Sequence, residues 1–454
     1  MDPYLSALAE KLPTNSVAII AAAPPVHLPN TIIPYPIYRQ DADFAYLTGV
    51  LQPNVVMMLE RGPEEGGGGD GGDGVNDSHR YTLFVPPRSA RDEVWNGQRI
   101  GTVAATRFFG ADASHELSVM SEVVARAVSR ASAVFADVRS GGGGGDSSPV
   151  LKTALSAAGT MRDSGPPRPL RPIVHTLRWT KSLAEIQAMR ESVDADVAGF
   201  HAAMRTSVSG ATEYAVCAHH EHACKVLGAD RLAYPSVVAG GVGALVVHYA
   251  DMDRILRTND VLLMDAGCER RGYVSDITRT WPVNHEGFTA AQGDVYDAVL
   301  EAHRACIQTL RTSLSSGGDV SLQELHTLSV NVLSECLVNL GVGGGMSKTE
   351  MARGAYMRYF PHALGHWIGM DTHDTPTVRT TTPIKPGCAL TVEPGLYLPS
   401  DDLDVPKSMR GIGVRIEDDV AVTPDKGKLE ILSRGLPTGR CEVEEFVRQL
   451  RNVS

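Results

Sequence analysis

Four acidic residues stand at the end of, or within, short apolar runs of the kind that form buried strands. They are Asp265, Asp276, Glu393 and Glu417. A carboxylate in such a place is costly unless a positive charge meets it, and two neighbouring carboxylates raise each other's pKa. Bound divalent metal ions would remove this repulsion, because carboxylates can bridge two of them.

Three histidines, His362, His366 and His373, lie between the two pairs of acids. One imidazole among four carboxylates makes an oxygen-rich ligand set. Such a set suits Mn²⁺, with Co²⁺, Fe²⁺ and Zn²⁺ as rivals. Each acid taken alone is better interpreted as a helix cap, a strand-end salt bridge or a turn former. The metal interpretation therefore rests on the whole set.

The strands and helices that would position these residues can be predicted from hydrophobic periodicity and helix-capping signals. Strand-like runs at 261–264, 273–280, 389–392 and 414–416 carry or precede the four acids. Ser182 and Glu185 have capping-box spacing, and apolar residues then recur at steps of three and four up to Met204. Further helices are expected at 214–227 and 290–314. Long helices with separated strands in one domain predict the α+β class.

The N-terminal part alternates strand-like and helix-like segments and is expected to be a smaller α/β domain. Of two glycine-rich tracts, 66–74 interrupts this domain and 141–145 lies in the connection that follows it. Strand-like runs at 55–59 and 81–85 flank the first tract, which is interpreted as a long hairpin insertion. The predicted organisation is an N-terminal domain at 1–139, a flexible Gly/Pro-rich connection at 140–172 and a C-terminal domain at 173–454.

Composition excludes several classes of protein. The 454 residues carry a formal net charge of −11, which argues against nucleic acid because phosphate binding needs a basic face. No apolar run approaches the ~20 residues of a membrane span, and the first residues lack the basic and apolar regions of a secretory signal. The seven cysteines are scattered without a CxxC pair, which favours free thiols in a reducing compartment. A soluble, cytoplasmic protein without a membrane partner is expected.

A second candidate metal site lies in the run 219–224. From His220 this run nearly spells HExxH, but Cys224 occupies the closing position. His219 and His222 stand three residues apart on an expected helix, so both could reach one ion. The favoured interpretation is nevertheless an ordinary polar helix face.

The acids and histidines lie in segments that together resemble one known family, the Xaa-Pro aminopeptidases (aminopeptidase P). This family belongs to the prolidase and methionine aminopeptidase clan of metallopeptidases. Near the start, 38–49 and 95–99 resemble the N-terminal domain of aminopeptidase P, and the overall pattern is closest to the mitochondrial-type, intermediate-cleaving branch. The matching C-terminal segments are 234–241, 247–249, 263–267, 275–282, 362–366, 371–374, 391–397 and 413–419.

The resemblance implies a pita-bread (creatinase/aminopeptidase-like) fold for the C-terminal catalytic domain and a role for each matched residue. Asp265 would hold one metal ion, His366 and Glu393 the other, and Asp276 and Glu417 would bridge both. A hydroxide between the two ions would attack the N-terminal Xaa-Pro peptide bond. The implied substrate-site residues are His248, His362, His373 and Arg415. Of these, His248 and His373 would act in catalysis, and Arg415 would orient neighbouring carboxylates.

The resemblance also implies partners and leaves alternatives open. The expected substrates are peptides with proline in second position, the expected assembly is a homodimer, and mitochondria are an alternative compartment. A prolidase acting on Xaa-Pro dipeptides is one alternative, although the N-terminal signature favours longer peptides. A second is an intermediate-cleaving aminopeptidase that trims imported proteins. The third alternative is a metal-free binding protein. It is disfavoured because all five ligand positions carry the metal-binding residue that the family has there.

Overall fold

The computed structural model of the chain describes residues 3–35, 37–62, 79–137, 149–159 and 166–452. The chain divides into two compact units, Met1–Arg178 and Trp179–Ser454. Both glycine-rich tracts lie outside the described residues. Within the predicted connection at 140–172, the described residues include a helix at Pro149–Gly159 and a strand at Arg168–Pro169. The domain limits at 139 and 172 remain a prediction.

The first unit contains a mixed sheet in the order β4-β3-β2-β1-β5-β6. Strands β2 and β3 are antiparallel, with Val56 opposite Phe84 and Arg61 opposite His79, so the predicted hairpin around the first glycine tract is confirmed. Strands β4, β5 and β6 join by parallel pairing. The strands are β1 Ser16–Ala21, β2 Val56–Arg61, β3 His79–Val85, β4 Ala113–Glu116, β5 Ala133–Ala136 and β6 Arg168–Pro169.

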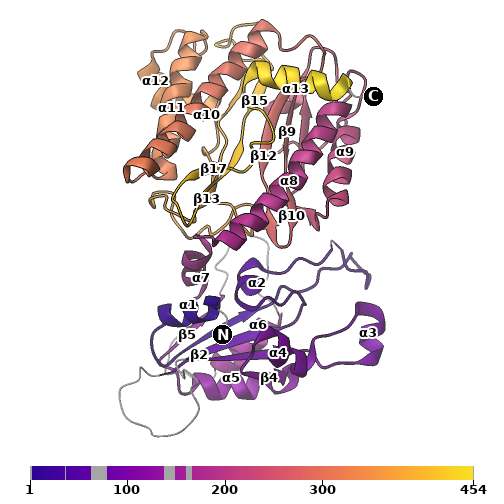
Figure 1. Cartoon of the computed structure of the whole chain (residues 1–454), viewed down its shortest axis with the longest axis vertical. Helices are drawn as coiled ribbons and strands as arrows, with labels where there is room; N and C mark the ends of the chain where they lie inside the picture. Colours follow the sequence, from indigo (N-terminus) through magenta and orange to yellow (C-terminus); the bar gives the residue numbers. More distant parts are fainter. Residues whose placement is uncertain (1–2, 36, 63–78, 138–148, 160–165, 453–454) are drawn as a thin grey trace. The chain divides into compact units, whose positions relative to one another are not determined.

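Helices pack on this sheet (Figure 1). Apolar side chains of α5 and α6 meet those of β1, β2 and β5 in one buried cluster, which includes Val124 and Leu151. Helix α1 contacts β2, β3 and α7. The helices are α1 Pro3–Lys11, α2 Ala42–Thr48, α3 Ala90–Asn96, α4 Gly101–Phe109, the 3₁₀ turn η1 Leu117–Val119, α5 Met120–Val128, α6 Pro149–Gly159 and α7 Arg171–Arg178.

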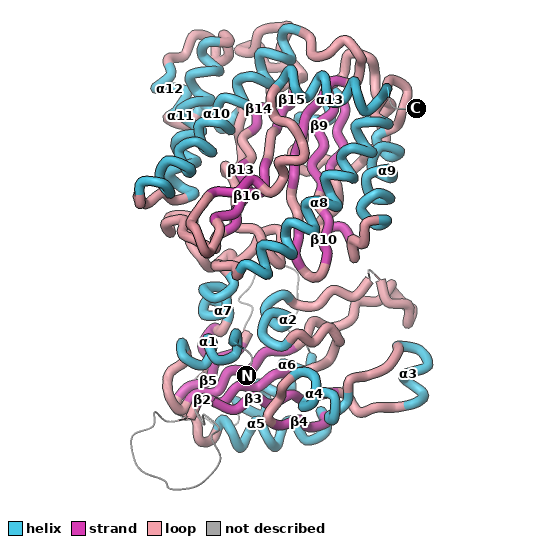
Figure 2. Tube along the Cα trace, viewed as in Figure 1, coloured by secondary structure: helices cyan, strands magenta, loops and turns pink. Residues whose placement is uncertain are grey.

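The second unit contains several small antiparallel sheets (Figure 2). Their orders are β12-β9-β8, β11-β10-β7, β13-β16-β17 and β14-β15. The strands are β7 Arg231–Leu232, β8 Val237–Gly240, β9 Val261–Ala266, β10 Cys268–Arg270, β11 Tyr273–Val274, β12 Ile277–Pro282, β13 Ala389–Val392, β14 Gly395–Tyr397, β15 Gly413–Arg415, β16 Asp418–Val422 and β17 Leu429–Ile431.

Long helices cover these sheets. Helix α8 contacts β10 and β11, whereas α10 contacts β13, β14 and β15. Mixed helices and separated antiparallel strands make this unit α+β, as expected. The helices are α8 Leu183–Thr206, α9 Glu213–Val226, η2 Gly241–Leu245, α10 Ala290–Ser316, α11 Leu322–Asn339, α12 Lys348–Ala352, η3 Ala355–Arg358 and α13 Arg440–Asn452.

Helix α8 begins as its sequence predicts. The Ser182 hydroxyl accepts from the backbone amide of Glu185, and the Glu185 carboxylate accepts from the amide of Ser182, which forms a capping box. The predicted apolar face is buried in the main core of the unit, including Ile186 and Met204, while Val197 is partly buried. In the described part of the chain, none of the helices combines the length and apolarity that a membrane span requires.

Candidate metal centre

Antiparallel strands place the four predicted acids. Asp265 lies in β9 opposite Thr278 of β12, and Asp276 directly precedes β12. Glu393 follows β13, and Glu417 lies between β15 and β16. The backbone amide of Glu417 donates to the carbonyl oxygen of Thr278 at 3.0 Å. Strands that are distant in sequence are therefore joined where the acids meet.

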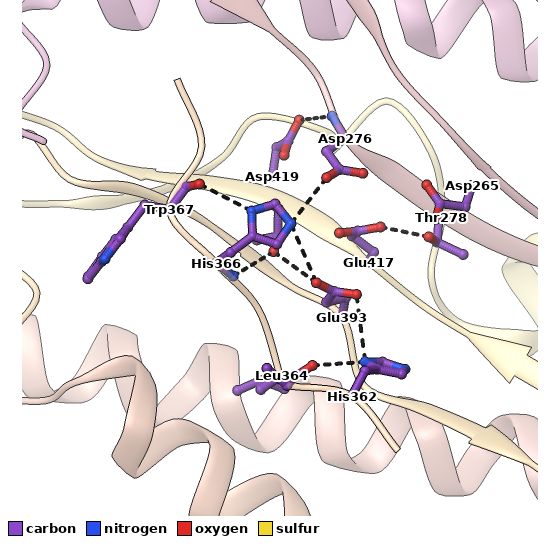
Figure 3. Close-up of polar contacts among 12 residues, drawn as sticks. Asp265, Asp276, Thr278, His362, Leu364, His366, Trp367, Glu393, Glu417 and Asp419 are labelled. Carbon is purple, nitrogen blue, oxygen red and sulfur yellow. Dashed lines mark hydrogen bonds and ion pairs between the residues drawn. The ribbon is translucent and has the colours of Figure 1, made fainter. Parts of the chain in front are cut away.

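The predicted ligand atoms converge. One ligand atom from each of Asp276, His366 and Glu417 lies within 4.8 Å of the other two. The Nε2 atom of His366 is 3.3 Å from Oδ2 of Asp276 and 3.6 Å from Oε1 of Glu393. Figure 3 shows these side chains turned toward one another, with Asp265 beside Thr278. The structure thus brings four predicted ligands into direct proximity.

Asp265 joins this group through the phenol of Tyr234, for which the sequence predicted no role. The Tyr234 hydroxyl lies 2.6 Å from Oδ1 of Asp265 and 2.5 Å from Oδ1 of Asp276. A phenol has one proton, so it cannot donate a full hydrogen bond to both carboxylates at once. Tyr234 therefore couples the two aspartates.

The carboxylates repel one another in a buried setting. Burial raises the pKa of Glu393 to about 8, with Asp276 and Asp265 adding to the effect and His366 opposing it. Burial, reinforced by neighbouring acids, also raises the pKa of Glu417. Arg415 and His366 do not fully neutralise this group of carboxylates. A divalent cation would stabilise it, because carboxylate oxygens and one imidazole are ligands that such cations bind. The residues present therefore fit such a cation.

Arg415 is the buried arginine of the site. Its guanidinium donates to Oδ2 of Asp265, to the Tyr397 hydroxyl at 2.8 Å and to the Thr278 hydroxyl at 3.0 Å. Thr278 in turn donates to Oε2 of Glu417 at 2.6 Å. Arg415 therefore positions one acid directly and a second acid through Thr278.

His366 is oriented by a hydrogen bond to the backbone of the next residue. Its Nδ1 lies 3.1 Å from the carbonyl oxygen of Trp367, which favours a proton on Nδ1 and turns Nε2 toward the acids. Burial opposes the imidazolium, but the hydrogen bond and charge of Asp276 outweigh it and raise the pKa of His366 to about 9. A Cβ at Gly365 would lie 2.1 Å from the carbonyl oxygen of Thr391, so only glycine permits this approach.

His362 stands at the edge of the acidic group. Its Nδ1 is 3.8 Å from Oε2 of Glu393, and its Nε2 is 2.8 Å from the Tyr397 hydroxyl. Burial, and then the charge of Arg415, lowers the pKa of His362 to about 4. Its imidazole is therefore neutral near pH 7.

The other two predicted histidines are exposed and lie near the site. The ring of His373 lies 4.3 Å from that of His366. Partial burial, and then the charge of His366, lower the pKa of His373. His248 follows η2 and is close enough to lower the pKa of both His362 and His373. All nine predicted site residues therefore belong to one neighbourhood.

A cavity of about 300 Å³ adjoins His362. Its lining is mainly apolar and aromatic, with residues of α11, η3 and the segment that carries His362. The lining residues include Leu322, His326, Tyr356, Phe360 and Leu364.

The residues that connect the ligands were not predicted from the sequence. Tyr234, Thr278 and Tyr397 lie inside the segments that carry the resemblance, but nothing in their type or spacing indicated a partner. Asp419 was also missed. Its Oδ2 accepts from the backbone amide of Asp276 at 2.9 Å, and burial raises its pKa.

Two protein-family models match the chain. Residues 187–424 match "Metallopeptidase family M24", and residues 5–135 match "Aminopeptidase P, N-terminal domain". Together they cover both units.

Named relatives and a solved structure agree with these models. The chain is 34% identical over 440 residues to "Intermediate cleaving peptidase 55, mitochondrial" of Arabidopsis thaliana, covering 97% of this chain and 81% of the relative. It is 34% identical over 436 residues to human "Xaa-Pro aminopeptidase 3", with 96% and 82% covered. "Proline aminopeptidase P II from Yersinia pestis" superposes with a TM-score of 0.85 at 31% identity over 98% of both chains. The expected pita-bread architecture with an N-terminal α/β domain is thereby confirmed.

Proposed function

Because the chain belongs to metallopeptidase family M24 and is a metal-dependent aminopeptidase, we propose that it cleaves the first residue from peptides whose second residue is proline. The observation that carries the proposal is the convergence of Asp276, His366, Glu393 and Glu417 from separate segments of the chain. A relative named Xaa-Pro aminopeptidase 3 and a neighbour titled proline aminopeptidase P II support the proline preference.

We assign the metal ligands as the resemblance to the family implies. Asp265 would hold one ion, His366 and Glu393 the other, and Asp276 and Glu417 would contact both. Two Mn²⁺ ions suit this set, with Co²⁺, Fe²⁺ and Zn²⁺ as competitors, because oxygen ligands predominate. When bound, such ions polarise the scissile carbonyl and lower the pKa of water toward ~7.

The chain's own groups have distinct tasks around these ions. Arg415 and Thr278 hold two acids in place, so the ligands need little rearrangement. His362 is neutral near pH 7, and its Nδ1 and Nε2 already contact the carbonyl oxygen of Ala363 and the Tyr397 hydroxyl, so we assign it to shaping the pocket around the proline. We assign proton movement and carbonyl stabilisation to His248 and His373. Both are exposed, so a substrate can reach them.

Proline recognition needs a site that does not require an amide proton, because an Xaa-Pro bond has none. The apolar cavity beside His362 offers aromatic walls of the kind that suit a saturated ring. We propose that this cavity receives apolar substrate side chains at or beyond the proline.

The direct test is a paired peptide screen. Peptides with proline in second position would be compared with matched peptides carrying alanine there, first with Mn²⁺ and then with a chelator. Selective cleavage of the proline set that is lost on chelation is expected. Equal cleavage of both sets would contradict the proposed preference for proline. Failure to cleave peptides longer than Xaa-Pro dipeptides would favour a prolidase.

A matched pair of variants tests the ligand assignment. Glu417→Ala should lower kcat/KM by more than the ~100-fold typical of a residue that only supports a ligand. Glu430→Ala removes a carboxylate that pairs with Arg190 and should leave activity nearly unchanged. An active Glu417→Ala enzyme with normal metal content would contradict the assignment.

The name of the Arabidopsis relative favours a second candidate, an intermediate-cleaving peptidase. In that case the first residue of the substrate, and not proline at the second position, would determine the cleavage rate. A peptide series varied only at the first position separates the two functions. The same name favours mitochondria as the compartment, whereas the sequence alone favours the cytoplasm. Tagged protein in fractionated cells distinguishes them, and light scattering tests the proposed homodimer.

A further inference from the structure

A second cluster of metal-binding side chains lies away from the acidic site. We call it the α8–α9 cluster: Asp196 of α8, His220 and Cys224 of α9, and Cys268 of β10. All four residues are at most 1% exposed. One ligand atom from each of Asp196, His220 and Cys224 lies within 4.8 Å of the other two.

Two of its members, His220 and Cys224, lie in the run 219–224, whose residue pattern favoured a polar helix face. That interpretation holds for His219 and His222, which are exposed. It is wrong for His220 and Cys224, which lie four residues apart on α9 and face the interior. Such spacing places two side chains on the same side of a helix.

A glycine allows the two helices to approach closely at this point. A Cβ at Gly199 of α8 would lie 2.6 Å from Cδ2 of His220 and 2.7 Å from Sγ of Cys224. Any larger residue would therefore displace both side chains. The close approach leaves Nε2 of His220 at 2.7 Å from Oδ1 of Asp196 and 3.7 Å from Sγ of Cys224.

Cys268 brings a second sulfur. Cys224 and Cys268 pack together with Ala195 in one small buried cluster. The Cys268 thiol donates to the carbonyl oxygen of Ser192 at 3.3 Å. The chain therefore gathers two sulfur atoms, one imidazole and one carboxylate.

The carboxylate is not fully satisfied by the protein. Among the described residues, Oδ2 of Asp196 is buried and makes no hydrogen bond. Burial raises the pKa of Asp196, and the neighbouring Ser275 hydroxyl donates to the carbonyl oxygen of Cys268 at 3.3 Å. A buried carboxylate oxygen without a partner is costly, and a cation would remove that cost.

We propose that the α8–α9 cluster binds one structural zinc ion through Asp196, His220, Cys224 and Cys268. Zinc prefers four tetrahedral ligands of this kind, with Zn–S distances of ~2.3 Å and Zn–N distances of ~2.0 Å. These lengths separate sulfur and nitrogen ligands by roughly 3.5 Å, close to the 3.7 Å between Cys224 and His220. Asp196 must move away from His220 by about half an ångström or bind through Oδ2.

The ligand set indicates a structural role. Four protein ligands leave no open position for water or substrate, unlike a catalytic zinc site. The ion would connect α9 to α8 and to β10. Zinc binding displaces the thiol protons of Cys224 and Cys268 and any proton on Nε2 of His220, and these protons pass to solvent.

Cobalt substitution tests the proposal without measuring activity. Full-length protein would be stripped with a strong chelator and titrated with Co²⁺. The acidic site contains no cysteine, so a thiolate-to-cobalt charge-transfer band reports only a sulfur-containing site. We expect one equivalent of Co²⁺ to develop this band in the wild type and zinc to remove it.

Matched variants locate the site. Cys224→Ser should abolish the band, whereas Cys306→Ser, which changes another fully buried thiol that donates to a backbone carbonyl, should retain it. Persistence of the band in Cys224→Ser would overturn the assignment.

X-ray absorption at the zinc edge of the loaded wild type provides a measurement that does not depend on whether a variant folds. A sulfur shell near ~2.3 Å is expected. No charge-transfer band and no sulfur shell in the wild type would overturn the proposal, even if the enzyme cleaves Xaa-Pro peptides normally.

Discussion

At the scale of single residues, the hydroxyl group of Tyr234, with its single proton, lies between two carboxylates. Asp265 and Asp276 both approach its hydroxyl within 2.6 Å. Tyr234 is therefore positioned to hold the two aspartates at a fixed separation and to change partners when a cation binds. A group that orients ligands in this way contributes to metal affinity without contacting the ion.

We predict that Tyr234→Phe weakens Mn²⁺ binding by about 10- to 100-fold, because both aspartates lose their shared donor. Titration calorimetry on the stripped enzyme measures the change. The matched control is Tyr296→Phe, which removes a buried hydroxyl bonded to the carbonyl of Thr438. That variant should lose about 1 kcal/mol of stability and keep its metal affinity. Wild-type affinity in Tyr234→Phe would contradict the assigned role.

Metal affinity should rise with pH. In the metal-free protein the pKa of Glu393 is about 8 and that of His366 about 9, so near pH 7 both groups hold protons that compete with a cation. Rising pH removes these protons, and the Mn²⁺ dissociation constant should fall until both groups have titrated. Calorimetry in two buffers with different heats of protonation should detect net proton release at pH 7. A dissociation constant that does not change with pH would refute this prediction.

At the scale of elements, an ionic network joins α2 and α7 in the first unit. Asp43 accepts a hydrogen bond from Arg178 and lies 3.4 Å from Nε2 of His175 and 3.5 Å from Nε of Arg171. Burial by itself would raise the pKa of Asp43, but His175 and the two arginines outweigh it and lower the pKa. The contacts of Arg178 and His175 therefore depend on the ionised Asp43 carboxylate, whereas Arg171 also pairs with Asp41 and Asp137.

Removing that carboxylate should be strongly destabilising, because Arg178 would keep a buried charge without this partner. We predict that Asp43→Ala lowers the free energy of unfolding by about 3–5 kcal/mol. Glu122→Ala breaks an exposed pair with Arg126 and should cost no more than about 0.5 kcal/mol. Denaturant titration of both variants is the measurement, and equal effects would contradict the prediction.

The pH dependence of this network has a definite sign. The pKa of Asp43 is lower in the folded protein than the ~3.9 of an unfolded aspartate. Its stabilising contribution is therefore present above about pH 4 and is lost as the pH falls further. The difference in stability between wild type and Asp43→Ala should shrink on acidification below that value.

At the scale of the whole molecule, all the predicted site residues belong to the unit Trp179–Ser454. A ligand that binds only the folded state stabilises the part of the chain that binds it, by about 2.7 kcal/mol at 100 times its dissociation constant. Calorimetric scans of full-length enzyme should therefore show Mn²⁺ raising the transition of this unit, while that of Met1–Arg178 stays in place. The Glu417→Gln variant should lose most of this shift. An equal upward shift of both transitions would count against the assignment.

Local sequence determined several elements correctly. Ser182 and Glu185 predicted the start of α8 because a capping box involves only neighbouring residues. The runs at 261–264 and 389–392 predicted β9 and β13, and the two runs around the first glycine tract predicted the β2–β3 hairpin. The identity of the acids and histidines, together with their resemblance to one family, was sufficient to predict the fold and the class of enzyme.

Tertiary structure alone decided which side chains meet. Tyr234 lies between Asp265 and Asp276, and Cys268 packs with Cys224, because the fold brings together segments that no local pattern relates. The inward direction of His220 depends on how closely α8 approaches α9 at Gly199. Periodicity and capping act over a few residues, whereas these contacts depend on the register of strands and helices that are distant in the chain.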